Sequence, residues 1–235
     1  GRANPEECRV PGDICRAAAK LREMDAAVRL TERLRLSPDP RTSFTFVDLC
    51  AGPGGFSQHL LLRDAQLRRA RAAAEDPQWR RRSGGAGGGR GARGWGVTLT
   101  RCPSGCRLRE DVLRQCCGRH ASYAVMAGPD GAGDLFDDRT AQQLQAAVVR
   151  GTAGGGVDLV VAAGGLDCSQ DHGAQEALTH ALLEREVHLA MRLLRPGGHL
   201  VVKLYDCFGN DTTTPLLRWL AGAFEALCLT KPLSS

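Results

Sequence analysis

FTFVDLCAGPGGFSQHLLLRDAQL, residues 44–67, is the stretch that decides the class of fold of this 235-residue chain. Its first six residues have the aromatic and β-branched composition of a strand. The glycine cluster from Gly52 to Gly55 then predicts a tight turn, and the apolar residues from Phe56 to Leu67 recur at helical spacing. The stretch therefore predicts a strand, a sharp turn and a helix, which is the unit that builds open parallel sheets.

Four further stretches have strand composition, and helical stretches separate most of them. They are GWGVTL (94–99), SYAVM (122–126), VDLVVAA (157–163) and HLVVKLY (199–205). Ahead of the first strand, apolar residues from Ile14 to Leu34 follow the 3.6-residue period of an amphipathic helix. Strands that alternate with helices predict a largely parallel sheet covered by helices on both faces.

Composition narrows the class of protein. With 43% hydrophobic residues the chain can enclose one large core, and its apolar runs are much shorter than the roughly 18 residues of a membrane helix. No signal-peptide pattern opens the chain, and ten scattered cysteines are more typical of reduced intracellular thiols than of a disulfide framework. We therefore expect a soluble protein without membrane contact, whose net charge of +5 permits an anionic partner.

Residues 68–93 interrupt this pattern. They contain eight arginines and a Gly-rich run, with only Glu75 and Asp76 as acidic residues. Such a segment buries too little apolar area to offset its ordering entropy, so we expect a disordered Arg/Gly-rich insertion at about 68–93. It is either an arm that binds nucleic acid or a solvated linker.

The glycine turn differs from the common nucleotide-binding loops. Its spacing is not the GxGxxG of a dinucleotide fold, and no acidic residue ends the second strand, where GVTLT runs into Arg101. No Gly-Lys-Ser/Thr follows, as a phosphate loop requires. From the residues alone, the turn either brings backbone close to another kind of cofactor or is a plain tight connection.

CAGPGGFSQHLL (50–61) resembles the S-adenosylmethionine turn of the FtsJ-like (RrmJ-like) ribose 2′-O-methyltransferases, and most closely that of the cap-specific mRNA enzymes that make the cap 1 structure. Further stretches resemble this family in the same order: KLREMDAAV from Lys20, GWGVTL from Gly94, GAGDLF from Gly131, DLVVAAGG from Asp158, QEALTHALL from Gln175, RPGGHLVVKLYDCF from Arg195 and LCLTKPLSS from Leu227. The resemblance implies an N-terminal extension (1–12) and one methyltransferase domain (13–235). It also implies a Rossmann-like α/β fold with a mostly parallel seven-stranded sheet and helices on both faces.

By the same resemblance, S-adenosylmethionine is the cofactor of the turn. Its methionine and ribose end would contact Cys50, Ala51, Gly52, Pro53, Gly54, Gly55 and Phe56. Asp134, which is followed by Leu135, would meet the adenosine portion. From the sequence alone, Asp134 is also explained as a turn residue after Gly133.

Two lysines match the catalytic lysines of the family. Transfer of a methyl group to a ribose hydroxyl needs a group that removes the hydroxyl proton or stabilises the developing charge, and a lysine does either, depending on its burial and neighbours. Lys20, in KLREMD, and Lys203, in VVKLY, occupy the matching positions. Without the resemblance, Lys20 is explained as a solvated helix residue and Lys203 as an edge-strand residue.

The family's aspartate is missing. The resemblance aligns its ADGG motif with AAGG (162–165), so that Ala163 occupies the position of the carboxylate that would orient Lys203. Losing such a partner costs roughly two to four orders of magnitude in rate. Asp167 and Asp206 are candidate substitutes, but neither is at the matching position. Ala163 is an introduced substitution, the mark of an inactive relative that still binds ligands, or part of a rearranged site, and the sequence does not separate these explanations.

The function that the resemblance implies is S-adenosylmethionine-dependent methylation of the ribose 2′-hydroxyl of the first transcribed nucleotide of capped mRNA, with activity impaired at Ala163. One alternative is a catalytically inactive module that binds RNA or a protein. Another is a 2′-O-methyltransferase of ribosomal or transfer RNA. The resemblance also implies a nuclear location, with the cytoplasm as a second one.

RNA is the partner that the resemblance implies, and no metal is expected. Gln175 matches a position that contacts RNA, whereas its polarity alone is explained by a helix start. Arg22 is placed to meet a phosphate or to form a salt bridge. Cysteines and a histidine between 102 and 120 do not form the paired CxxC frame of a zinc site.

Overall fold

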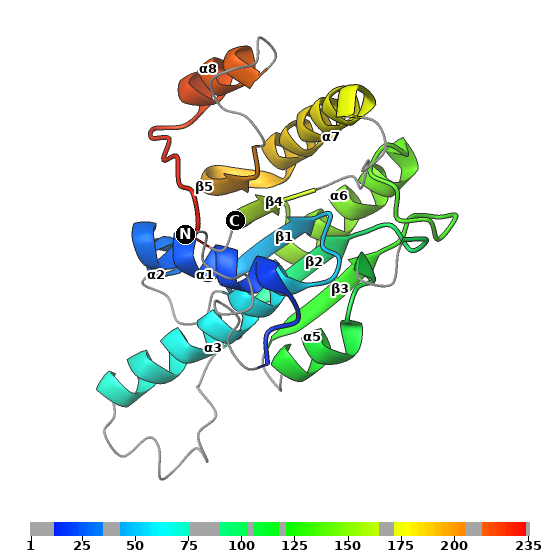
Figure 1. The fold of residues 1–235 in the computed structure, drawn as a ribbon. Helices are drawn as coiled ribbons and strands as arrows, with labels where there is room; N and C mark the ends of the chain where they lie inside the picture. The colour runs from blue at the N-terminus through cyan, green and yellow to red at the C-terminus, as the bar shows by residue number, and fades with distance from the viewer. Residues whose placement is uncertain are drawn as a thin grey trace.

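The computed structural model describes residues 12–34, 43–75, 90–102, 106–117, 121–164, 172–204 and 213–233. Five strands form one sheet, in which all pairings are parallel and the order is β3-β2-β1-β4-β5 (Figure 1). The strands are β1 (Thr45–Leu49), β2 (Arg93–Val97), β3 (Ser122–Met126), β4 (Val157–Ala162) and β5 (Leu194–Val202). Each strand overlaps one of the stretches predicted from composition, and the predicted parallel arrangement is confirmed.

The seven-stranded sheet that the resemblance implied is wrong for the part of the chain that the structure describes, where the sheet has five strands. The strand-like composition of the sequence also marks only these five. After α8 (Thr213–Ala223), the segment as far as residue 233 forms no strand. Its Leu227 and Leu229 are exposed, and Pro232 lacks the N–H that a sheet ladder requires.

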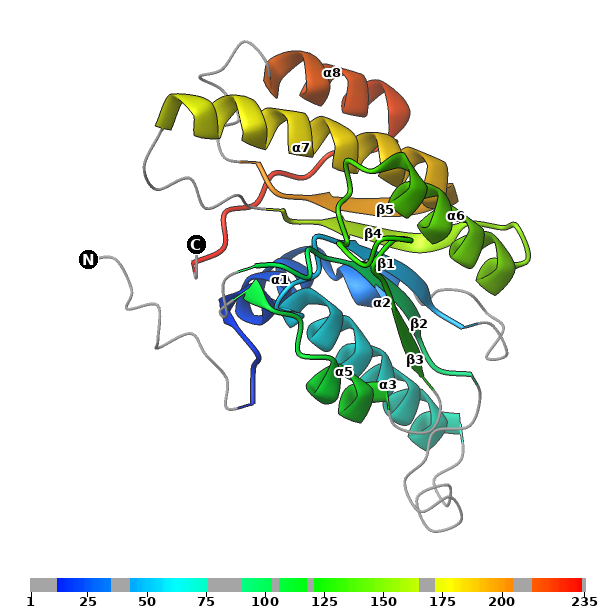
Figure 2. The same cartoon turned by 90° about the vertical axis from the view of Figure 1, so that its right-hand side faces the viewer.

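Helices cover both faces of the sheet (Figure 2). One face carries α1 (Arg16–Val28), α2 (Leu30–Leu34), α3 (Gly55–Glu75) and α5 (Glu110–Cys117), and the other carries α6 (Asp138–Thr152), α7 (His172–Leu193) and α8. Side chains alternate along a strand, so β1 contributes to both cores. Phe46 packs in the same core as Leu60 of α3, whereas Val47 packs in the same core as Leu144 of α6 and Leu189 of α7.

The helix predicted from Ile14 to Leu34 is divided into α1 and α2. Arg29 has a φ of 52°, the left-handed conformation that ends a helix. The buried carboxylate of Asp25 stabilises this break, because it accepts hydrogen bonds from the Thr31 backbone N–H at 2.8 Å and from the Thr31 hydroxyl at 2.7 Å. His59 Nε2 of α3 lies 3.0 Å from the same carboxylate. Asp25 thus fixes α1, α2 and α3 to one another.

Helix α3 continues into the segment where a disordered insertion was expected. Residues 68–75 are helical, and Arg68 Nε donates to Asp64 Oδ2 at 2.8 Å. The same oxygen accepts from the Ala92 backbone N–H at 3.1 Å, just before β2. Residues 76–89 lie outside the described residues. In the described ranges, no helix has both the length and the apolar character needed to cross a membrane.

Candidate active site

The order of the strands reverses between β1 and β4. From β1 the chain builds outward to β2 and β3, and it then returns to place β4 and β5 on the other side. In open α/β sheets, the carboxyl ends of the strands at such a reversal form the crevice that binds ligands. Cys50 follows β1 and Ala163 follows β4, so both predicted site residues lie where this rule places a ligand, a position that we call the candidate crevice.

Backbone contacts hold the turn after β1 in place. The Ala51 N–H donates to the Val97 carbonyl at 2.8 Å, and the Pro53 carbonyl accepts from the Arg109 N–H at 3.1 Å. Cys50 has a φ of 62°, which is uncommon for a residue with a side chain. These contacts tie the turn to the end of β2 and to the segment before α5, so its shape is set before any ligand arrives.

Close packing explains two glycines of the turn. A Cβ atom at Gly52 would lie 2.1 Å from the Cys106 carbonyl oxygen. A Cβ atom at Gly55 would lie 2.6 Å from Cys15 Sγ and 2.7 Å from the Ala18 backbone nitrogen of α1. Glycine at position 55 therefore lets the turn pack against α1, the helix that carries Lys20, and glycine at position 52 lets it pack against the segment that contains Cys106.

Asp134, the residue predicted to meet the adenosine portion of the cofactor, lies in the segment after β3. The Asp134 carboxylate accepts a hydrogen bond from the Phe136 backbone N–H at 2.9 Å, as expected of a turn residue. The Ala132 carbonyl accepts from the Thr100 N–H at 2.9 Å, which joins this segment to the end of β2. Asp134 thus stabilises a turn and also lies at the edge of the sheet where the Cys50 turn lies.

Two residues predicted to line the cofactor lie in the cores. Phe56 is 8% exposed and packs in the core between the sheet and α3, and Leu135 is 4% exposed and packs in the core on the opposite face. They support the turn and the Asp134 segment from beneath.

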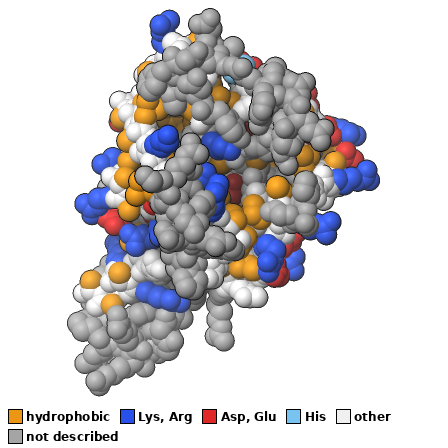
Figure 3. All heavy atoms as spheres, viewed as in Figure 1, with side chains coloured by type: hydrophobic (Ala, Val, Ile, Leu, Met, Phe, Trp, Pro, Cys, Tyr) orange, Lys and Arg blue, Asp and Glu red, His pale blue; other side chains and the backbone are white. Residues whose placement is uncertain are grey.

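The structure places the two predicted lysines within electrostatic reach of each other. Ala162 of β4 pairs with Val202 of β5, so that Ala163 and Lys203 follow as neighbours at the strand ends. Burial, the charge of Arg16 and the charge of Lys203 lower the pKa of Lys20 on α1. Figure 3 shows basic and acidic side chains close together near the middle of this face, over the region where Figure 1 places the ends of β1 and β4.

Asp48 is a buried carboxylate of the site that the sequence analysis did not single out. It lies on β1 and is 2% exposed. Its Oδ2 accepts from the Ser57 hydroxyl at 2.6 Å, and Ser57 Oγ lies 2.9 Å from Tyr123 Oη. Burial raises the pKa of Asp48 to about 7. The signal in the sequence is a carboxylate within the otherwise apolar strand directly before the turn.

Glu186 is the second buried carboxylate that was missed. It lies on α7, is 2% exposed, and accepts a hydrogen bond at Oε1 from the Gly164 backbone N–H at 2.9 Å. Burial raises the pKa of Glu186 to about 7. Its sequence signal is its position on the apolar face of the helix, one turn from Leu182 and from Leu189.

Comparison with known proteins agrees with this arrangement. The model of the FtsJ-like methyltransferase family matches residues 14–235. The chain belongs to the FtsJ-like methyltransferase family. The family predicted from the motifs is therefore confirmed.

Curated relatives of this FtsJ-like chain carry the name of one enzyme class. The chain is 31% identical over 243 residues to the mouse protein named cap-specific mRNA (nucleoside-2′-O-)-methyltransferase 1, an alignment that covers 100% of this chain and 26% of the mouse protein. It is 29% identical over 191 residues to the cap-specific mRNA (nucleoside-2′-O-)-methyltransferase of Autographa californica nuclear polyhedrosis virus, covering 81% of this chain and 59% of the viral protein. The chain thus spans about a quarter of the length of the mouse relative.

FtsJ-like methyltransferases depend on S-adenosylmethionine as a class. The surroundings of Cys50 fit this cationic cofactor, because burial and the negative charges of Glu186, Asp48 and Asp134 raise the pKa of the Cys50 thiol well above its usual value. A site with these carboxylates favours a bound positive charge. The turn 50–55 and Asp134 are the residues that would hold the cofactor in this FtsJ-like chain.

The structure bears on one of the two residues predicted to contact RNA, Arg22, and does not describe the side chain of the other, Gln175. Arg22 of α1 forms a salt bridge with both carboxylate oxygens of Asp13, at 2.6 and 2.8 Å, which is the alternative interpretation of this residue. Gln175 lies on α7, but its side chain is outside the described residues, as are Asp167 and Asp206. Within the described ranges, no group of three or more His, Cys, Asp and Glu side chains is arranged to hold a metal ion.

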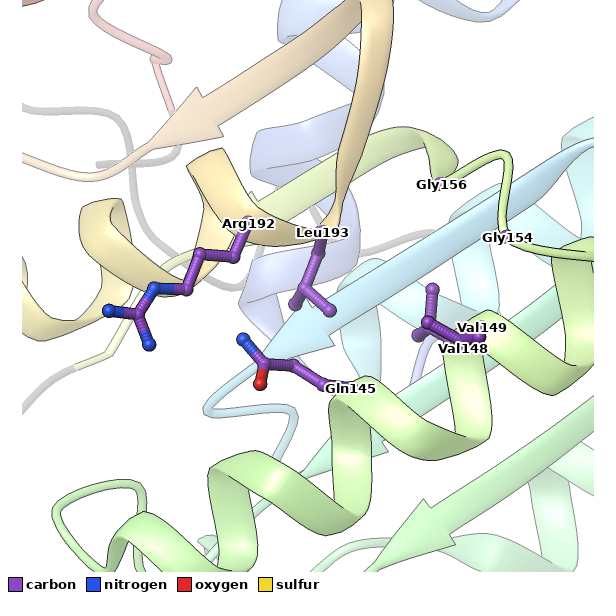
Figure 4. A pocket seen from close by; sticks show the side chains of 7 residues that line it. All are labelled: Gln145, Val148, Val149, Gly154, Gly156, Arg192 and Leu193. Atoms are coloured by element: carbon purple, nitrogen blue, oxygen red, sulfur yellow. The ribbon is translucent and has the colours of Figure 1, made fainter.

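A cavity of about 200 Å³ lies elsewhere on the FtsJ-like domain (Figure 4). Val148 and Val149 of α6, together with Arg192 and Leu193 at the end of α7, form part of its lining. Gly156, just before β4, also lines it. This position is at the amino end of β4, the opposite edge of the sheet from Cys50 and Ala163, so the cavity is separate from the crevice.

Proposed function

We propose that this chain transfers a methyl group from S-adenosylmethionine to the ribose 2′-hydroxyl of the first transcribed nucleotide of capped mRNA. The observation that carries the proposal is that Lys203, which follows β5 beside Ala163, is near enough to Lys20 for its charge to lower the pKa of Lys20. The names of the mouse and viral relatives support the capped substrate.

The side chains at the crevice suit an anionic acceptor. Lys20 and Lys203 attract the phosphates of RNA, and Arg16 adds a third positive charge close to Lys20. The lowered pKa of Lys20 makes its neutral form more accessible than that of an ordinary lysine. A neutral amine takes the proton from the acceptor hydroxyl, and a charged one stabilises the oxygen as negative charge develops on it. The bound cofactor supplies an electrophilic methyl group.

A transfer assay with radioactive S-adenosylmethionine tests the proposal. The substrates are a capped transcript with a free 2′-hydroxyl on its first nucleotide, the same transcript already methylated there, and an uncapped transcript. We expect label in the first substrate only. Lys203→Ala should lower the rate at least about 100-fold, whereas Arg192→Ala, a basic residue at the opposite edge of the sheet, should leave it unchanged.

Each alternative function has its own outcome in this assay. Methylation of uncapped ribosomal or transfer RNA in preference to capped RNA would favour a 2′-O-methyltransferase of ribosomal or transfer RNA. Ala163 supports a catalytically inactive binding module, because the methyl side chain at this position cannot act as the family's carboxylate. Calorimetric binding of capped RNA without label transfer would favour this module, and a folded chain that binds no S-adenosylmethionine would refute the cofactor assignment.

A further inference from the structure

Glu186 touches both sides of the candidate crevice. Its Oε1 accepts from the Gly164 N–H at 2.9 Å, and its carboxylate is also hydrogen-bonded to the Cys50 thiol. Gly164 comes two residues after β4 ends, and Cys50 directly follows β1. One buried side chain from α7 therefore joins the two strand ends at which the strand order reverses.

The packing around Gly164 is built around this carboxylate. A Cβ atom at position 164 would lie 2.8 Å from Glu186 Oε1, 3.0 Å from Cys50 Sγ and 2.7 Å from Leu182 Cδ2. All three atoms are already in place, so the glycine leaves room for the Glu186 carboxylate directly beside the Cys50 thiol. The arrangement fixes the position of the backbone next to Ala163.

Glu186 is also electrically coupled to the predicted catalytic lysine. The ionisable groups that act on it are Cys50 and Asp48 from the β1 side and Lys203 from the β5 side. Burial dominates and raises the pKa of Glu186, the Asp48 charge raises it further, and the Lys203 charge lowers it. Ionised Glu186 therefore places a negative charge within electrostatic reach of Lys203.

Building on the proposed methyl transfer, we propose that Glu186 is a positioning residue of the transfer site, which holds the Cys50 turn against the end of β4 and supplies negative charge to Lys203 from helix α7. Position 163, the neighbour of Lys203 at the strand ends, offers only a methyl group. Glu186 acts through Cys50, Gly164 and Lys203.

A lysine titration tests this role without depending on catalysis. The chain has only three lysines, Lys20, Lys203 and Lys231, so that ¹³C-methylated lysine side chains give few NMR signals, which single lysine-to-arginine variants assign. In the parent protein we expect the Lys203 signal to show an inflection near pH 7, where Glu186 ionises. In Glu186→Gln this inflection should disappear, because the variant has no carboxyl group that ionises there.

Glu184→Gln is the matched control. It makes the same chemical change on the same helix, but the Glu184 side chain is 54% exposed and pairs with His180. The inflection of the Lys203 signal near pH 7 should be unchanged in this variant. If Glu186→Gln does not fold, the parent protein is compared with Glu186→Asp, which keeps the charge. The Lys203 signal should show the inflection in both proteins. A Lys203 signal without the inflection in the parent, or with the same inflection in the parent and in Glu186→Gln, would overturn the proposal.

Methyl transfer supplies the second readout. With capped RNA, we expect Glu186→Gln to lower kcat about 10-fold or more, to leave the KM for RNA within about 2-fold, and to remove a kinetic pKa near 7. An unchanged kcat in an active enzyme would also overturn the proposal. If the parent transfers no methyl group but the inflection of its Lys203 signal disappears in Glu186→Gln, the proposed function fails while the coupling of Glu186 to Lys203 stands.

Discussion

Replacing Ala163 with aspartate measures how strongly the reaction depends on a carboxylate beside Lys203. Ala162 and Val202 are paired, so the Cα atoms of the two following residues are about 5 Å apart and an aspartate carboxylate can come within about 4 Å of the Lys203 ammonium. At this separation, opposite charges attract by about 4 kcal/mol at an effective dielectric constant of 20. Lys203 is exposed, so solvent screening and side-chain ordering reduce the net gain to about 1–2 kcal/mol.

A gain of this size in the transition state corresponds to a roughly 5- to 30-fold higher kcat. This is less than the two to four orders of magnitude expected from the sequence, because exposure weakens the pair and Glu186 already places negative charge near Lys203. The assay is single-turnover methylation of capped RNA by the parent, Ala163→Asp and Ala163→Asn. The asparagine variant has the size of aspartate without its charge, so it separates electrostatics from packing against the neighbouring core. Equal rates for the aspartate and asparagine variants would refute the reasoning.

Three further variants test single contacts. Between about pH 4 and 7 the folded state keeps a proton on Asp48 that the unfolded state has released, so the stability of the fold falls as the pH rises through this window. In thermal melts from pH 5 to 7.5, Asp48→Asn should therefore lose less stability than the parent. Parallel plots of melting temperature against pH would contradict a raised pKa at Asp48. Asp25→Ala removes the shared acceptor of the Thr31 N–H and hydroxyl and should cost about 2–4 kcal/mol in urea denaturation, whereas a cost below about 1 kcal/mol would show that water replaces it. Arg22→Ala breaks the pair with Asp13 and should leave the affinity for capped RNA within about 2-fold, while a 10-fold loss would instead assign Arg22 to the RNA.

The sheet was predictable because local composition and local conformation agree along most of the chain. The β1 strand is aromatic and β-branched, it is followed by glycines, and it is buried on both faces, so nothing in the tertiary structure opposes the local preference. At β5 the two disagree. Pro196 and Gly197 favour a turn, yet the strand begins at Leu194, and the ladder with β4 accommodates the irregularity by a shift of register between Val157 and Leu159.

The division of the first helix illustrates a tertiary effect that periodicity does not contain. The apolar positions continue with helical spacing past Arg29, so the sequence pattern alone favours one helix. The buried Asp25 carboxylate instead captures the Thr31 N–H and hydroxyl and also meets His59 of α3. Because a buried carboxylate needs such partners, these contacts favour the left-handed residue at the break.

The candidate site was predictable to the extent that its residues lie at strand ends. Cys50 and Ala163 follow adjacent parallel strands, and such positions meet at one edge of the sheet whatever the loops do. The assignment of Lys20 and Lys203 to one site came from the family resemblance, because no spacing in the sequence relates the first helix to the end of the last strand. Glu186 was missed because it interrupts an apolar helix face, and its partners Cys50 and Gly164 become its neighbours only when the sheet has formed.

At the crevice the acidic side chains lie deeper than the basic ones, and each group suits a different ligand of the proposed reaction. Asp48 and Glu186 are buried beneath the Cys50 turn, whereas Lys203 is exposed and Lys20 is half-buried. The buried carboxylates favour a cationic group on the turn, and the lysines favour a polyanion above it. A sulfonium cofactor held there would lose its positive charge together with its methyl group, so Asp48 and Glu186 would attract the used cofactor less than the fresh one. Because burial places the pKa of both carboxyls at about 7, this discrimination should strengthen as the pH rises through 7.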